Sequence, residues 1–473
     1  MKNISKRLVA AALLPSILTS CSSTPSLYSA DGRERVTVAF WGDQLTESYG
    51  KYLQEKFPEV DFTFYAATNS TDFYRFKNDR KDLPDILTVR RFSLRDVENL
   101  KDALMDLSNT ELANMYNPSY LHSYTYSDGT VNWLPVCAEV DSIIVNKTLM
   151  KENGLNVPSN YGEFKKVCAD LTELGIRPMI SNFGADYTCM EILQGLSASQ
   201  LTSAEGREWR QQYESGKTDR LSEEVWLPVF ERMQEFIECA GITSADMDGS
   251  IAVFDEYTAG RTAMVRGTGD EANRYRTEDR ENVLMPYFGE TENDNWYLTY
   301  PSFQIAASSA AEESPERKEL ILKIMTAMLN EEGLHSISQH QDMISYGKND
   351  NIELSPALAP METYIDSNRL FIRLASAEMF SVSKLVVQKM IRGEYPDAKA
   401  AFDDFNAEMG KTGDSDSVAA HIDKSLTYDF DPNGGSPAAS AVLNTVREEL
   451  GVQLLAAQAV NIAGSIAEGE YTE

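Results

Sequence analysis

The amino-acid sequence predicts an α/β protein with two or more domains. Its 473 residues are more than one hydrophobic core normally accommodates. Short β-branched and aromatic runs alternate with helical patterns in the N-terminal third, an order typical of parallel sheets flanked by helices. We therefore expect parallel-rich sheets covered by helices, followed by a small C-terminal module.

The first elements follow from the spacing of apolar residues. Residues 36–41 form a β-branched and aromatic run that Gly42-Asp43 ends, which predicts a strand. Apolar residues then recur at every fourth position from Tyr49 to Phe57, which predicts a helix that Pro58 stops. Two further strands are expected at 60–65 and 83–89.

The segment 134–147 is the most informative part of the chain. It ends in a short apolar run at 143–145, typical of a buried strand, and Glu139 lies before this run among few other charges. A carboxylate in such a place either bonds local backbone N–H groups or faces a cleft. Ligands of parallel sheets bind beyond the carboxyl ends of the strands, a rule that points to Trp41 with Asp43, to Arg90 with Arg91, and to the loop bearing Glu139.

Helices and strands continue to alternate through the rest of the chain. Asn160 and Glu163 form a capping box for a helix that Gly175 ends, and Ser314-Pro315 opens another helix with Gly333 past its end. Helical patterns also cover 201–241 and 369–409, and the second is broken near 393–396. Further strands are expected at 176–180, at 296–300 and at 303–307, and the segment 259–265 is expected to pass from a loop into a strand.

Composition narrows the class of partner. The net charge is −30, which disfavours nucleic acid and anionic lipid surfaces as partners of the folded body. The four histidines are not arranged as ligand pairs, so neither a metal nor a cofactor is expected. They are His122, His335, His340 and His421.

The N-terminus has the pattern of a processing signal. Basic residues precede an apolar segment at 8–18 that is too short to span a membrane as a stable helix, and Leu-Thr-Ser-Cys follows at 18–21. This ending resembles the bacterial lipobox, which implies that residues 1–20 are removed and that Cys21 is acylated. The alternative is an ordinary secretory signal with an incidental Cys. We expect a lipid-anchored, extracytoplasmic protein on the cell membrane, with 21–35 as a polar linker.

The remaining cysteines give no zinc signature, because none of them forms a CxxC pair. Cys168 falls on the apolar face of the helix capped by Asn160 and is interpreted as a small core residue. Export permits disulfides, but the spacing of these cysteines does not require one. The other three are Cys137, Cys189 and Cys239.

The order of these signals resembles the bacterial extracellular solute-binding proteins that deliver sugars and related solutes to ABC importers. Five features carry the resemblance across roughly residues 36–409. They are the lipobox, Phe40-Trp41-Gly42-Asp43, Leu83-Pro84-Asp85-Ile86, the segment 134–147 with Gly154 and Pro158 beyond it, and Gly260-Arg261-Thr262-Ala263-Met264.

The resemblance implies a two-lobed, type II periplasmic-binding-protein-like fold. Lobe 1 would comprise 36–144 with a return at 301–344, and lobe 2 would comprise 145–300 with 345–428. A hinge between the lobes would let a small-molecule solute, a sugar or oligosaccharide, stabilise the closed form. The permease subunits would then recognise a closed monomer without catalysis. The segment 429–437 would link the body to a partial module at 438–473.

The resemblance also implies ligand-binding residues. In maltose-binding-protein-like members, a Gly-Asp after the first strand and a Glu four residues after a Pro bind sugar hydroxyls, and Asp43 and Glu139 stand in these places. Ionised carboxylates suit this task because they can accept from two hydroxyls of one ring. Phe380 falls where such proteins have a sugar-stacking aromatic, and core packing is its other interpretation.

The sequence departs from that pattern at two stacking positions, which fall on Val89 and Gly269. Two interpretations remain open for the arginines beside them: they hold an anionic group of the solute, or they pair with local acids. These arginines are Arg90, Arg91 and Arg266. Four aromatic residues could replace the lost stacking surface or could pack in the core. They are Phe183, Tyr187, Trp296 and Tyr297.

Other functions remain as alternatives. Asp43 and Glu139 could form the acid/base pair of a carbohydrate-active hydrolase. Residues 444–472 faintly resemble the substrate-binding domain of 5'-nucleotidases, although the metal-ligand clusters of that catalytic domain are missing from the sequence. A sensory or adhesive lipoprotein, with a cleft filled by its own side chains, is a third alternative.

Overall fold

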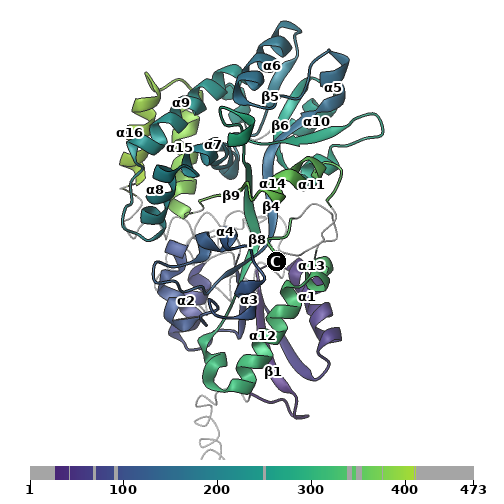
Figure 1. Cartoon of the computed structure of the whole chain (residues 1–473), viewed down its shortest axis with the longest axis vertical. Helices are drawn as coiled ribbons and strands as arrows, with labels where there is room; N and C mark the ends of the chain where they lie inside the picture. The colour runs from purple at the N-terminus through teal and green to yellow at the C-terminus, as the bar shows by residue number, and fades with distance from the viewer. Residues whose placement is uncertain are drawn as a thin grey trace, which may run out of the picture.

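The computed structural model describes residues 27–41, 43–67, 71–89, 94–248, 252–337, 344–347, 354–374, 376–409 and 411. The predicted signal peptide, Cys21, the linker 429–437 and the module 438–473 lie outside the described residues. Figure 1 shows an elongated molecule in which two helix-covered regions are joined by the long strands β4 (Leu134–Asn146) and β8 (Tyr297–Ala307). Within the described part of the chain, every helix is too short or too polar to cross a membrane.

The N-terminal strands pair in parallel, as the sequence predicts. β1 (Glu34–Phe40) lies between β2 (Val60–Ala66) and β3 (Ile86–Val89) and is parallel to both. Tyr49 and Leu53 of the first helix are fully buried, which confirms the apolar spacing. The helices of this region are α1 (Asp43–Lys56), α2 (Thr71–Asp79), α3 (Glu111–Asn114), α4 (Pro118–Leu121), α12 (Pro315–Leu329) and α13 (Glu331–Ile337).

One mixed sheet connects the two regions. Among the described residues its order is β2-β1-β3-β8-β4-β6-β5. β4 runs antiparallel to β8, β6 and β7, whereas β5 is parallel to β6 and β9 is parallel to β8. The strands not yet bounded are β5 (Arg177–Ile180), β6 (Thr262–Thr268), β7 (Asn282–Met285) and β9 (Leu370–Ile372).

β8 is one continuous strand where the sequence predicts two, at 296–300 and 303–307. Pro301, which lies between them, is opposite Ala138 of β4. The Ala138 N–H donates to the Ile344 carbonyl at 2.6 Å, and the Ala138 carbonyl accepts from the Ile344 N–H at 2.9 Å. Because Ala138 has these bonds to a third segment, the strand pair tolerates the missing N–H of Pro301.

Alternate residues of β4 face different hydrophobic cores. Val140 and Ile144 belong to the core that contains β1 and β3, whereas Ile143 and Val145 belong to the core formed with the helices of the second region. The remaining helices are α5 (Lys147–Glu152), α6 (Tyr161–Glu173), α7 (Asp186–Leu201), α8 (Ala204–Glu214), α9 (Glu223–Cys239), α10 (Val253–Thr258), α11 (Gly269–Arg274), α14 (Glu362–Asp366), α15 (Ala377–Ile391) and α16 (Ala398–Met409).

The helix starts predicted from capping residues are confirmed. The Asn160 side chain accepts the Glu163 N–H at 3.0 Å at the start of α6, and Ser314 Oγ accepts the Arg317 N–H at 3.0 Å at the start of α12. The Glu163 carboxylate accepts the N–H of Ser159 instead of that of Asn160, so only the Asn160 half of the predicted capping box forms. Gly333 lies past the end of α12 but inside α13. A side chain is excluded there, because an added Cβ would come within 2.1 Å of the Ala327 carbonyl oxygen. The predicted helical stretch from residue 369 begins instead with strand β9.

The cap of α12 allows a simple test of the fold. We expect Ser314→Ala to lower the free energy of unfolding by about 1 kcal/mol, because the first turn loses a bonded N–H group. Ser222 begins α9 without a side-chain cap hydrogen bond, so Ser222→Ala is the matched control. Chemical denaturation of both variants checks this, and an equal loss in the two would contradict the assigned role of Ser314.

Candidate functional site

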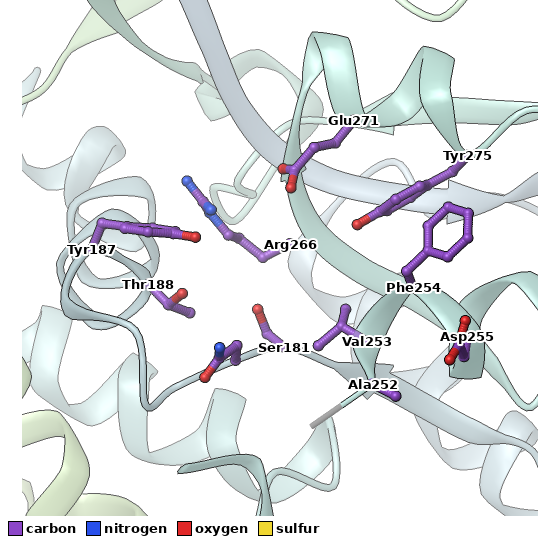
Figure 2. A pocket seen from close by; sticks show the side chains of 11 residues that line it. Ser181, Tyr187, Thr188, Ala252, Val253, Phe254, Asp255, Arg266, Glu271 and Tyr275 are labelled. Atoms are coloured by element: carbon purple, nitrogen blue, oxygen red, sulfur yellow. The ribbon is translucent and has the colours of Figure 1, made fainter. Parts of the chain in front are cut away.

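A pocket of about 300 Å³ opens where β5 and β6 end. These strands are parallel, so their carboxyl ends meet at one edge of the sheet, the edge at which α/β proteins bind ligands. The wall is completed by the first turn of α7 and by α10 and α11. Figure 2 shows the lining side chains, which are Ser181, Asn182, Tyr187, Thr188, Ala252, Val253, Phe254, Asp255, Arg266, Glu271 and Tyr275.

Arg266 forms a buried ion pair at the base of this pocket. Its Nε donates to Asp141 Oδ1 at 3.1 Å, and its Nη2 donates to the other carboxylate oxygen. The Tyr287 hydroxyl donates to Asp141 Oδ1 at 3.1 Å. The Asp141 side chain is fully buried, and that of Arg266 is 6% exposed. The positive charge of Arg266 is therefore balanced within the protein.

Aromatic rings lie on both sides of Arg266 in Figure 2. The Tyr187 ring centroid is 5.0 Å from the guanidinium carbon, and 46% of Tyr187 is exposed. On the other side, Phe254 is 48% exposed and packs against Tyr275 with ring centroids 5.2 Å apart. Burial raises the pKa of Tyr275 to about 12, so its hydroxyl remains protonated at neutral pH. The pocket therefore presents the flat apolar faces of aromatic rings next to polar groups.

The carboxylates of the pocket have different environments. Glu271 accepts the Thr268 N–H at 2.9 Å as part of a capping box, and its other oxygen is 3.5 Å from Arg274. Asp255 lies in an exposed part of α10. The side-chain carbonyl oxygen of Asn182 accepts hydrogen bonds from the backbone N–H groups of Gly184 and Ala185, which fixes the loop after β5. Hydrogen-bonding groups therefore surround the aromatic surfaces.

The structure brings two of the predicted site residues together, Tyr187 and Arg266. Of the two interpretations of Arg266, pairing with a local acid describes its contact with Asp141. Phe183 has no exposed surface and belongs to the second core, so it does not line the pocket. Trp296 is half-buried against the same core, and Tyr297 is buried with its hydroxyl donating to the Leu284 carbonyl.

The other predicted site residues lie on separate elements. Trp41 follows β1 and its backbone N–H donates to Thr88 Oγ1 at 2.9 Å, while Glu139 is half-buried in β4 opposite Tyr300. Phe380 is half-buried in α15. Arg90, Arg91 and the side chain of Asp43 lie outside the described residues, so their roles stay predictions.

Sequence reasoning missed several pocket residues. Ser181 and Asn182 directly follow a predicted strand, so the rule about the carboxyl ends of strands could have identified them. Phe254 and Tyr275 carry no such signal, because helix and loop packing brings these distant segments together. Among the described residues, no group of three or more His, Cys, Asp or Glu side chains is placed to hold a metal ion.

Comparisons with known proteins give structural matches only. No family model matches the sequence, and no curated protein matches it. The fold is similar to that of a family 1 extracellular solute-binding protein from Bifidobacterium longum subsp. infantis, with 19% identity and a TM-score of 0.68 over 80% of this chain and 100% of that chain. It is also similar to apo RafE from Streptococcus pneumoniae, with 15% identity and a TM-score of 0.64 over 79% and 97% of the chains.

A third solved structure is similar over the same region. Maltose-bound MalE3 from T. maritima has 11% identity and a TM-score of 0.56, with 80% of this chain and 99% of that chain covered. RafE has also been solved in complex with raffinose. These neighbours define the class of fold: the chain has the two-lobed α/β fold of extracellular solute-binding proteins, as the sequence predicts.

Proposed function

We propose that this protein is an extracytoplasmic receptor that binds a neutral sugar or oligosaccharide and delivers it to an ABC importer. The observation that carries the proposal is the pocket at the ends of β5 and β6, which combines exposed aromatic rings with hydrogen-bonding groups. Sugar rings present apolar faces and hydroxyl edges, and such a pocket complements both. The raffinose and maltose complexes of proteins with this fold support the same solute class.

The charges of the pocket favour a neutral solute over an anionic one. Asp141 neutralises the charge of Arg266, so this guanidinium offers a phosphate or carboxylate little net electrostatic attraction. Asp255 and Glu271 add carboxylates to the lining, and these repel an anion. Hydroxyl groups, in contrast, can donate to the carboxylate oxygens. The anionic alternative therefore depends on Arg90 and Arg91.

The proposal includes closure of two lobes around the solute. The strands β4 and β8 pass between the two helix-covered regions, and Cys137 of β4 has a φ of 41°, which is uncommon for a residue other than glycine. Pro301 and the bonds from Ala138 to Ile344 lie beside it. This interruption of a regular ladder is a suitable place for a hinge. We assign lobe 1 to 36–144 with 301–344 and lobe 2 to 145–300 with 345–428.

Cys21 would anchor the protein to the outer face of the cell membrane through acylation. Residues 21–35 would then act as a tether, and permease subunits would recognise the closed monomer. The solute is bound and released without catalysis in this proposal. We also propose Trp41, Asp43, Glu139 and Phe380 as further contacts of the solute, on the basis of their resemblance to the solute-binding positions of this fold.

A thermal-shift screen tests the proposed solute class. The chain from Ser22 onward would be heated with neutral mono- and oligosaccharides, sugar phosphates and acidic sugars. A ligand at 100 times its dissociation constant adds about 2.7 kcal/mol of stability, so a true solute gives a clear shift. We expect the largest shift from a neutral oligosaccharide. A shift only with anionic ligands would contradict the neutral class, and no shift with any sugar would contradict the receptor role.

The exposed ring of Tyr187 gives the first prediction for binding. We expect Tyr187→Ala to weaken binding of the neutral solute by roughly tenfold or more, because about 1–3 kcal/mol of stacking and burial is lost. Leu174 is also exposed, at 52%, but lies at the end of α6 away from the pocket lining, so Leu174→Ala is the control. Isothermal titration calorimetry measures the affinity of both variants for the solute. An unchanged affinity in Tyr187→Ala would show that this residue is not part of the site.

A further inference from the structure

Helices α6 and α9 pack side by side with matching positions along their length. The Tyr161 hydroxyl donates to the Arg232 carbonyl at 3.3 Å, between residues 71 positions apart. One turn further along, Lys165 Nζ donates to Glu235 Oε1 at 2.7 Å, a separation of 70 positions. From the first contact to the second, the residue numbers increase in both helices, so α6 and α9 run parallel where they pack together.

The same alignment brings two cysteines together. Phe164 and Phe236 stack with ring centroids 5.5 Å apart and planes inclined by 7°. The next matched positions, one helical turn beyond these rings, are Cys168 of α6 and Cys239 at the end of α9. Cys168 is buried and Cys239 is half-buried, and each thiol shifts the pKa of the other. Both cysteines belong to or pack against the second core, and neither lines the solute pocket.

We propose that Cys168 and Cys239 are a modification site, at which a disulfide forms and joins α6 to α9. The joined helices hold the second core at the place where Phe164 and Phe236 stack. This crosslink restricts the unfolded chain across the long segment between the two cysteines and thereby stabilises the folded form. This disulfide rests on the proposed location outside the cytoplasm and does not depend on the identity of the solute.

The chemistry requires an oxidant, which we take to be a disulfide of low molecular weight or of a thiol oxidase outside the cytoplasm. The thiolate of Cys239 attacks one sulfur of that disulfide and expels a thiolate, giving a mixed disulfide. Cys168 loses its proton and displaces the second thiolate, so two cysteine thiols are oxidised and one disulfide is reduced to two thiols. Half-burial makes Cys239 the accessible member, and the neighbouring Cys168 thiol lowers the pKa of the Cys239 thiol.

Peptide mapping of the purified chain tests the proposal. The protein is reduced, freed of reductant, incubated with oxidised glutathione, then denatured and alkylated. We expect Cys168 and Cys239 to be recovered as one crosslinked peptide pair, and Cys137 and Cys189 to be recovered alkylated. The melting temperature of the oxidised protein should exceed that of the reduced protein by about 5 °C or more.

Two variants complete the experiment. Cys239→Ala should lose the oxidant-dependent rise in melting temperature, whereas Cys189→Ala, which replaces a buried cysteine of the same core, should keep it. The mapping of the unmodified sequence does not depend on either variant folding. Recovery of both Cys168 and Cys239 as alkylated thiols would overturn the proposal, and so would recovery of Cys239 only as a glutathione adduct.

Discussion

The Asp141→Ala variant is expected to lose about 3–5 kcal/mol of unfolding free energy, the loss typical when one partner of a buried ion pair is removed. Arg266 would remain at the base of the pocket with 6% of its side chain exposed and without the carboxylate that accepts from its Nε and Nη2. The Tyr287 hydroxyl would lose the same acceptor. Thermal and urea denaturation measure this loss.

The same variant should also change the preference for solutes. Without Asp141, the guanidinium of Arg266 is free to bind an anion in the pocket, so we expect weaker binding of the neutral sugar and new binding of a sugar phosphate. The double variant Asp141→Leu with Arg266→Met removes both charges and should recover most of the lost stability. A single variant as stable as the unmodified protein would show that the pair does not have the assigned role.

The second large effect is expected at another buried pair, which lies apart from the pocket lining. Glu191 of α7 is fully buried, and Arg373, which follows β9, has 3% of its side chain exposed. The guanidinium of Arg373 also lies 4.3 Å from the centroid of the Tyr300 ring. We expect Glu191→Ala to lower the free energy of unfolding by about 3–5 kcal/mol, because Arg373 loses its buried carboxylate.

Glu191→Ala is informative because it should affect stability without changing solute preference. The affinity of the folded fraction for the neutral solute should stay within about twofold of the original, since Glu191 is absent from the pocket lining. Titration below the melting temperature of the variant separates the two effects. We assign the preference for a neutral solute to the pair of Asp141 and Arg266. New binding of sugar phosphates by Glu191→Ala would contradict this assignment.

The sequence predicted those elements whose signals are local. The cap at Asn160, the apolar spacing from Tyr49 to Phe57 and the β-branched run at 143–145 each reflect contacts within a few residues, and the structure confirms the corresponding helices and strand. The continuous strand β8 was missed because a proline usually interrupts a strand. Its tolerance of Pro301 depends on Ile344, which is distant in sequence.

The pocket was harder to predict from the sequence, because its residues also come from segments that are distant in the chain. Arg266 and Tyr187 were identified from loops that follow strands, but the partner of Arg266, Asp141, is 125 positions away and faces it only through the antiparallel pairing of β4 and β6. Phe183 and Tyr187 belong to one loop-to-helix segment and cannot be distinguished by residue type. The fold buries the first and exposes the second.

The most direct test of the account is a crystal structure of the protein with the neutral oligosaccharide that gives the largest thermal shift. We expect an intact sugar between the lobes, with one ring against Tyr187 and hydroxyls bonded to the polar groups at the ends of β5 and β6. A sugar bound elsewhere on the surface, or a cleaved product in the pocket, would contradict the proposed receptor.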